Sequence, residues 1–284
     1  MPVAEMPVRS ALADASMVSV PLRQWRAASA ALEGDAGAEG GSAVFWDVLP
    51  GGVLVSAIAD GADAPRGAAG AAIATRHAAK CVRKRAEANG APRRPADASS
   101  LLMCACHAAR AALMAAAERL RVSPHDLDCA LRVALCTPDM LTCASLGATG
   151  LHVEDASGRA LDAPCHTHDR SAGPLLTGLD ALERLRISVA HARVRRLILH
   201  NASAAEAVRR LLRGGDALSG ALAVSRNERE ATGRIEALLH MACAPAAPAV
   251  VLVAALDTPS AAALAPGARA RRREAEPALV ARAA

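Results

Sequence analysis

"VLVSAIADGADAPRGAAGAAIATRHAAKC", residues 53–81, is the stretch of sequence from which the fold can be worked out. An apolar run stops at Asp60-Gly61, a turn rich in Gly and Pro follows, and the next residues are rich in alanine. The apolar run predicts a buried strand, and the apolar face over residues 66–89 predicts an amphipathic helix. Asp60 therefore stands at the end of a buried strand, and a catalytic role would require other residues to join it.

The flanking residues predict mainly antiparallel strands. Residues 43–60 contain two β-rich runs joined by a Pro-Gly-Gly turn, which is the pattern of a hairpin. Residues 128–164 alternate with a period of two and contain two turn sequences, which predicts an antiparallel meander. Two further apolar runs, over residues 195–201 and 249–256, are also predicted to be strands.

Several helices are expected between these strands. The residues 89–100 have the composition of a linker, and a second helix should follow, capped by Ser99 or Ser100. Further helices are predicted over residues 203–213 and between residues 217 and 241. This order of elements favours an α+β fold, with antiparallel sheets covered by helices.

Length and composition set the domain organisation. The 284 residues are 52% hydrophobic and 21% charged, the balance of a soluble globular protein. We expect a flexible leader over residues 1–20, one domain over residues 21–256 and a disordered Ala/Arg-rich tail over residues 257–284. Uncharged apolar runs fall short of the roughly 20 residues that a membrane span needs, so no membrane partner is expected.

The basic charge does not by itself indicate a nucleic-acid partner. The formal net charge is +5, but aromatic residues make up only 1% of the chain and do not alternate with the basic residues. The stacking platform of single-strand binders is therefore missing, and solvated helix faces with a basic tail account for the charge. Nucleic acid is not expected as a partner; salt-dependent binding that is lost on deleting residues 257–284 would indicate otherwise.

The eight cysteines favour a reducing environment. They lie in apolar surroundings, and the N-terminal residues lack the basic and apolar regions of a secretion signal, so we expect free thiols in the cytoplasm. Zinc is not predicted. Cys104 and Cys106 diverge on a helix, and the loop residues Cys165, His166 and His168 lack a fourth ligand.

The stretch around Asp60 resembles a known family. Residues 53–76 are similar to the strand, Asp-Gly turn and helix of the metal-dependent protein phosphatases (protein phosphatase 2C, PPM), particularly the bacterial branch. The order of later elements resembles the family over about residues 20–256, including "LILHN" (197–201) and the closing "VVLVAA" (250–255). The resemblance implies a sandwich of two antiparallel β-sheets flanked by α-helices.

The resemblance also implies a reaction and its cofactors. In this family two Mn²⁺ or Mg²⁺ ions hold a hydroxide that attacks a phosphoserine or phosphothreonine. Such hard cations need several oxygen ligands, chiefly carboxylates, gathered in one place. The resemblance assigns the bridging carboxylate to Asp60 and a carbonyl ligand to Gly61, and both are kept in this sequence.

At the other positions that the resemblance assigns to acids, this sequence has neutral residues. Ser42 stands where an early acid is expected, and Ala148 follows Gly147 in place of the acid of a Gly-Asp pair. Asn201 replaces the acid of a Ser/Thr-Asp-Gly strand end. Ala247 and Pro248 stand where a closing acid pair is expected. The metal site is thus predicted to be degenerate.

We therefore expect a protein phosphatase 2C-like pseudophosphatase that acts by binding a partner or phosphoprotein, with no cofactor. The alternative is an active Mn- or Mg-dependent serine/threonine phosphatase whose lost ligands are replaced by other acids. The candidate acids are Asp35, Glu39, Asp63 and Asp139. Bacterial relatives act opposite Ser/Thr kinases, so the resemblance implies a kinase or its phosphorylated substrate as the partner.

Asp60 also has a purely structural interpretation. A carboxylate at a strand end can accept backbone N–H bonds in the following turn, or cap the helix that begins after Pro65. Either role would keep Asp60 without any metal, and residual binding of a single metal ion is the alternative.

Overall fold

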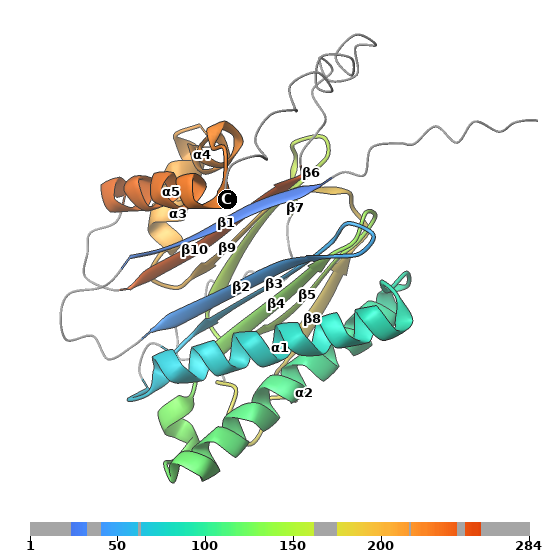
Figure 1. Ribbon diagram of the computed structural model, residues 1–284, viewed down its shortest axis with the longest axis vertical. Coiled ribbons are helices and arrows are strands. Elements are labelled where there is room, and N and C mark those ends of the chain that lie inside the picture. Colours follow the sequence, from blue (N-terminus) through green and yellow to red (C-terminus); the bar gives the residue numbers. More distant parts are fainter. Residues whose placement is uncertain are drawn as a thin grey trace, which may run out of the picture. The chain divides into compact units, whose positions relative to one another are not determined.

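The computed structural model describes residues 24–32, 41–61, 64–161, 175–215, 217–242 and 248–256. Within these residues two five-stranded antiparallel sheets stack face to face, and helices cover the outer face of each sheet (Figure 1). The predicted fold class, an α+β sandwich of two antiparallel sheets flanked by helices, is confirmed. The predicted leader and tail lie outside the described residues.

The first sheet has the strand order β2-β3-β4-β5-β8. Its centre is the hairpin predicted from the sequence, in which β2 and β3 pair over their full length and a turn at residues 50–52 joins them. Burial is complete along β3 and β4 because both faces of the sheet are covered. The strands are β2 (Ser42–Leu49), β3 (Val53–Asp60), β4 (Ala130–Cys136), β5 (Leu141–Leu146) and β8 (Arg186–Ala190).

The second sheet has the strand order β1-β10-β9-β6-β7. The two predicted apolar strands, β9 and β10, lie side by side in its middle, and the N-terminal strand β1 pairs with β10. The strands are β1 (Trp25–Leu32), β10 (Ala249–Leu256), β9 (Val194–Asn201), β6 (Thr149–Asp155) and β7 (Ala160–Leu161).

The helices form the two outer layers (Figure 1). Two long helices pack against the first sheet, and three shorter ones cover the second sheet. A short 3₁₀ helix, η1, precedes β4. The elements are α1 (Gly67–Asn89), α2 (Pro95–Leu120), η1 (Pro124–Leu127), α3 (Ala205–Arg213), α4 (Ala217–Val224) and α5 (Glu228–Ala242).

Small aliphatic side chains fill the three apolar layers of the protein. Between the sheets, Leu54 and Ile58 of β3 meet Leu199 and Leu252 of the opposite sheet. Alanine dominates the faces of α1 and α2 that pack on the first sheet, which lets the helices approach each other and the strands closely. The core of the described residues is thus built mainly from Ala, Leu, Val and Ile.

The linker between α1 and α2 is shorter than predicted. Helix α2 begins at Pro95, so the predicted linker over residues 89–100 already contains its first turns, and Ser99 and Ser100 lie inside the helix rather than capping it. The physical reason is that proline is well suited to a first helical turn, where no N–H bond is needed. The N-cap position belongs to Arg94, whose backbone is extended.

The predicted meander is divided between the two sheets. Strands β4 and β5 pair with each other in the first sheet, whereas β6 pairs with β7 and β9 in the second. The chain crosses between the sheets at Gly147, whose φ of 80° suits glycine, and Ala148. A period of two is the same in either sheet, so the pattern could not show where the crossing occurs.

Helix α2 is long and apolar enough to cross a membrane by length and composition alone. In this structure 44% of its most apolar window is buried, and α2 packs against α1 and the first sheet. Core helices of soluble proteins can have the same length and composition.

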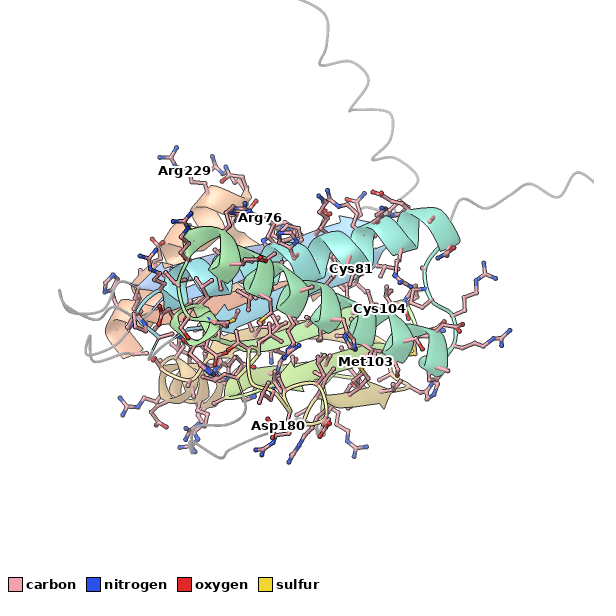
Figure 2. All side chains as sticks on the ribbon, turned by 90° about the horizontal axis from the view of Figure 1, so that it is seen from below. Arg76, Cys81, Met103, Cys104, Asp180 and Arg229 are labelled. Carbon is pink, nitrogen blue, oxygen red and sulfur yellow. The ribbon has the colours of Figure 1, made fainter. Side chains whose placement is uncertain are left out.

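The described cysteines are free thiols, as predicted. Cys106, Cys129, Cys136 and Cys143 are buried, and burial raises the pKa of the Cys106 thiol to about 12. Cys81 on α1 and Cys104 on α2 are half-buried, and Figure 2 labels both. These thiols have the character of core residues.

Candidate functional site

The residues singled out around Asp60 meet at one end of the sandwich, where four strands begin or end. Ser42, the first residue of β2, is paired with Asp60, the last residue of β3. In the other sheet Asn201, the last residue of β9, is paired with Thr149, the first residue of β6. The order of strands in each sheet therefore brings residues that are far apart in sequence to the same edge.

A chain of hydrogen bonds joins these residues across the two sheets. The hydroxyl of Ser42 donates to Oδ1 of Asp60 at 2.8 Å. Nδ2 of Asn201 donates to Oγ of Ser42 at 3.0 Å and to the carbonyl oxygen of Pro248 at 2.8 Å. We call this arrangement of Asp60, Ser42, Asn201 and Pro248 the inter-sheet hydrogen-bond chain.

The amide of Asn201 has all of its hydrogen-bonding capacity in use. Its Oδ1 accepts hydrogen bonds from the backbone N–H groups of Ala204, at 3.1 Å, and Val250, at 3.2 Å. Together with the two bonds donated by Nδ2, this makes four, which is the full capacity of a primary amide. The side chain is 1% exposed, so it holds the start of β10 and the turn before α3 in place from inside the protein.

The turn after Asp60 is fixed by a close approach of two glycines. The N–H of Gly61 donates to the carbonyl of Gly41 at 3.0 Å, and the carbonyl of Gly61 accepts from the N–H of Ala64 at 3.2 Å. A Cβ at Gly67, the first residue of α1, would lie 1.8 Å from the carbonyl oxygen of Gly61. Only glycine fits there, so the Asp-Gly turn is packed directly against the start of α1.

The remaining predicted positions add no charged group. Ala148 lies in the crossing between the sheets, directly before Thr149. The hydroxyl of Thr149 is buried and has no hydrogen-bond partner in the part of the chain that the structure describes. Ala247 lies outside the described residues, whereas Pro248 contributes its backbone carbonyl. The N-cap position of α1 belongs to Arg66, so Asp60 does not occupy the capping position that its structural interpretation offered.

Asp128 is a second carboxylate at this end, which the sequence analysis missed. It is 6% exposed, and its Oδ1 accepts from the N–H groups of Cys129, at 3.1 Å, and Thr177, at 2.9 Å. Burial raises the pKa of the Cys129 thiol, and the negative charges of Asp128 and Asp60 raise it further. Both carboxylates therefore lie near this thiol. The pairing of β3 with β4, which sets Asp60 opposite Ala130, is the signal that could have found it.

Arg132 was also missed, although it stands in an apolar strand. It is fully buried, and it lies opposite Ile58 on the face of the sheet that meets the other sheet. Asp60 is two residues further along β3 and faces the same way, so the two side chains are diagonal neighbours. Nη2 of Arg132 donates to Oγ of Ser145 at 3.0 Å. A guanidinium group therefore brings positive charge into the layer that contains Asp60.

The acid Asp139 lies too far from Asp60 to share a metal ion with it, contrary to the alternative considered from the sequence. It lies in the turn between β4 and β5, at the opposite end of the sheet from Asp60, and pairs with Arg193 at 3.3 Å. Because β3 has eight residues, the two ends are about 23 Å apart. The other candidate acids, Asp35, Glu39 and Asp63, lie outside the described residues.

Clusters of metal-binding side chains are absent from the described ranges. No group of three or more His, Cys, Asp or Glu residues within them could hold a metal ion. Cys104 and Cys106 lie on α2, with Cys106 buried and Cys104 half-buried, in keeping with the predicted divergence. Cys165, His166 and His168 lie in the undescribed segment 162–174.

His200 stands directly before Asn201 and is expected to make stability depend on pH. Burial lowers its pKa to about 4, against the effect of a hydrogen bond at 2.8 Å between Nδ1 and the Asn201 carbonyl, and His152 stacks on its ring. The imidazole of His200 therefore binds a proton below about pH 6.5 in the unfolded chain, but only below about pH 4 in the folded protein. The free energy of unfolding should fall by roughly 3 kcal/mol between those pH values.

Urea unfolding at pH 7, 6, 5 and 4.5 measures this dependence. In His200→Gln the fall in the free energy of unfolding between pH 6.5 and 4.5 should be markedly smaller, whatever the variant's stability at pH 7. His191→Gln, an exposed histidine at the far end of the sheet, should keep the wild-type dependence. An unchanged dependence in His200→Gln would show that other groups cause the acid sensitivity.

Comparisons with known proteins agree with this architecture. A family model of protein phosphatase 2C matches residues 36–200, more than half of the chain. A comparison with curated proteins gives no match.

Among solved structures, the chain is similar to the catalytic domain of the serine threonine protein phosphatase PstP in complex with two manganese ions (TM-score 0.55, 17% identity, covering 83% of this chain and 100% of that one). It is also similar to a bacterial serine phosphatase (TM-score 0.56, 12% identity, covering 81% and 97%). A third similar structure is the serine/threonine phosphatase Stp1 from Staphylococcus aureus (TM-score 0.54, 12% identity, covering 82% and 95%). At such identities these structures support the fold alone. The match to the family model over residues 36–200 shows that the chain belongs to the protein phosphatase 2C family.

Proposed function

We propose that this protein is a pseudophosphatase of the family, which has lost metal-assisted catalysis and acts by binding a partner. The observation that carries the proposal is the inter-sheet hydrogen-bond chain. The amide of Asn201 uses both of its lone pairs on backbone N–H groups, so it has none left for a cation. Coordination by Asn201 would require breaking bonds that hold α3 and β10 in place.

The charges at this end of the sandwich also disfavour a pair of divalent cations. PstP holds two manganese ions, and such cations are held mainly by charged oxygen ligands, whose number sets the affinity. Of the positions that the resemblance assigns to acids, only Asp60 supplies a carboxylate here. Asp128 is engaged with two backbone N–H groups, and the buried guanidinium of Arg132 lies in the same layer as Asp60. These residues therefore fit hydrogen bonding between the sheets better than metal binding.

We further propose that the partner is a protein of the phosphorylation system, a Ser/Thr kinase or its phosphorylated substrate. PstP and Stp1 are described as serine/threonine phosphatases, and a family member without catalysis would keep a fold suited to such partners. Family membership and the chemistry of the site support this proposal.

Turnover of a phosphothreonine peptide in the presence of Mn²⁺ tests the loss of catalysis. The protein should release phosphate at least about a thousandfold more slowly than the PstP catalytic domain in the same buffer, because metal ions supply several kcal/mol of transition-state stabilisation. Asp60→Asn should leave the residual rate unchanged. Mn²⁺-dependent turnover that this substitution abolishes would instead support the active phosphatase, with Asp35, Glu39 or Asp63 as replacement ligands.

A further inference from the structure

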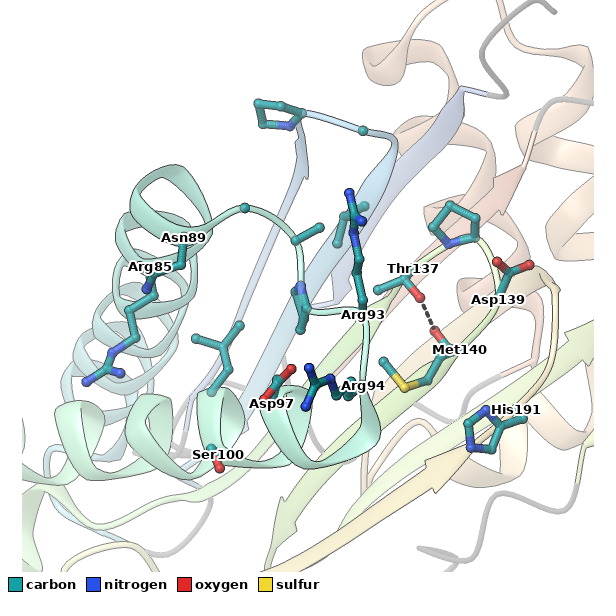
Figure 3. A pocket seen from close by; sticks show the side chains of 18 residues that line it. Arg85, Asn89, Arg93, Arg94, Asp97, Ser100, Thr137, Asp139, Met140 and His191 are labelled. Carbon is teal, nitrogen blue, oxygen red and sulfur yellow. Dashed lines mark hydrogen bonds between the residues drawn. The ribbon is translucent and has the colours of Figure 1, made fainter.

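A cavity of about 1190 Å³ lies at the other end of the first sheet from Asp60. Its walls are the β2–β3 turn, the β4–β5 turn, the end of α1, the α1–α2 connection and the first turns of α2 (Figure 3). We call it the arginine pocket. Strand β3 separates it from Asp60 by about 23 Å, so it is distinct from the site described above.

The pocket is lined by more arginines than carboxylates. Figure 3 shows Arg93 and Arg94 near the centre, in the connection between the helices, and Arg85 on α1 to the left. Both Arg93 and Arg94 are exposed, and neither forms an ion pair with any residue that the structure describes. Their charges are therefore available to a ligand.

Two carboxylates in the lining offset part of this charge. Asp139 is paired with Arg193 at 3.3 Å, which leaves Asp97 in the first turn of α2 as the main competitor. The charge of Arg85 lowers the pKa of the nearby Cys81 thiol, against the larger effect of burial, so Arg85 acts less directly on the pocket than the other two arginines. The balance of the lining remains positive, and its charges stand in a hollow surface, which strengthens the field on an anion.

The lining also contains apolar side chains, beside the polar residues Asn89, Ser100, Thr137 and His191. Val53, Leu101 and Met140 contribute aliphatic side chains, and the prolines at positions 50, 92 and 138 stiffen the surrounding turns. Thr137 donates from its hydroxyl to the carbonyl of Met140 at 3.3 Å, which closes the β4–β5 turn (Figure 3). The pocket can therefore hold an apolar group beside an anion.

We propose that the arginine pocket binds a phosphate-bearing ligand with an apolar portion. Guanidinium groups bind phosphate oxygens through paired N–H donors, and both Arg93 and Arg94 line the pocket with exposed side chains that can supply them. The cavity is at least as large as typical small-molecule sites, so the phosphate can be carried by a nucleotide or by a phosphorylated protein side chain. The proposal does not depend on whether the Asp60 end binds metal.

Calorimetric titrations of the full chain with ATP, a phosphothreonine peptide and its unphosphorylated twin test the proposal. At least one phosphorylated probe should bind with a dissociation constant below about 1 mM, and the unphosphorylated peptide should not. Arg93→Gln/Arg94→Gln should weaken binding at least tenfold, and raised salt should weaken binding to the wild type. Preference for ATP or for the peptide then identifies the source of the phosphate.

Arg119→Gln is the matched control for these substitutions. Arg119 is exposed near the other end of α2, about 36 Å from Pro95, and lies outside the pocket. Arg119→Gln and Asp60→Asn should both bind like the wild type, which separates this proposal from the one about the Asp60 end. The proposal is overturned if no phosphorylated probe binds, or if Arg93→Gln/Arg94→Gln binds as tightly as Arg119→Gln.

Discussion

Asn201→Ala should lower the free energy of unfolding by about 2–6 kcal/mol, because it leaves the buried N–H groups of Ala204 and Val250 without an acceptor. It also removes the bond to Ser42, which joins the two sheets, and the bond to the carbonyl of Pro248, which ties the end of β9 to the start of β10. Urea unfolding followed by circular dichroism measures the loss. The expected result would show that this end of the sandwich is held together by hydrogen bonds.

Asn227→Ala is a matched control for the loss of an asparagine. Oδ1 of Asn227 accepts from the N–H of Glu230 at 2.9 Å at the exposed start of α5. Its removal should cost only about 1 kcal/mol, as for an ordinary helix cap. Equal losses in the two variants would contradict the special role of Asn201.

Asn201→Asp restores the acid that the resemblance expects and should also destabilise the protein at neutral pH. The new carboxylate oxygen would face the carbonyl of Pro248, where Nδ2 now donates at 2.8 Å. Two acceptors cannot satisfy each other, so the folded protein should favour the protonated acid. Addition of Mn²⁺ should not raise the melting temperature; a clear rise would indicate that this end can still assemble a metal site.

Gly70→Ala should also destabilise the protein strongly, lowering the free energy of unfolding by about 3 kcal/mol or more. A Cβ at this position of α1 would lie 1.9 Å from the carbonyl oxygen of Leu127 in η1. That neighbour is backbone, and the N–H of Arg66 already ties η1 to α1 through the carbonyl of Asp126 at 2.8 Å. The contact therefore cannot relax without moving η1, which leads into Asp128 and β4.

Gly233→Ala in α5 is the control, and it should raise the free energy of unfolding rather than lower it. A Cβ there would meet nothing within 4 Å, so alanine should stabilise the helix by about 0.5–1 kcal/mol. The melting temperatures of both variants and the wild type, measured by thermal unfolding, test the two predictions. A tolerated Gly70→Ala would show that η1 is less firmly packed against α1 than the structure indicates.

Much of the fold could be predicted from the sequence because its strongest patterns are local. The strands β3, β9 and β10 are continuous apolar runs, and the helix α1 has a clear apolar face. The division of residues 128–164 between two sheets could not be predicted, because it is decided by long-range pairing. Strand β8 was not predicted either, since it is short and only partly buried at the edge of its sheet.

The site could be predicted in position but not in its interactions. The resemblance indicated that Ser42, Asp60 and Asn201 would converge, and the strand pairing brings them to one edge. That a serine and an amide would bond to each other and to Asp60 depends on side-chain geometry, which no residue pattern specifies. Asp128 and Arg132 were missed because their proximity to Asp60 arises from the register of β4.

Calorimetric titration of Mn²⁺ into the full-length protein tests the central claim most directly, with Asp60→Asn titrated in parallel. Asp60→Asn removes the carboxylate while keeping an acceptor for the hydroxyl of Ser42. If the inter-sheet hydrogen-bond chain has replaced the metal site, both proteins should show the same small heats without saturation. Saturable binding to the wild type that is lost in Asp60→Asn would contradict the account and show that a metal ion competes successfully with these hydrogen bonds.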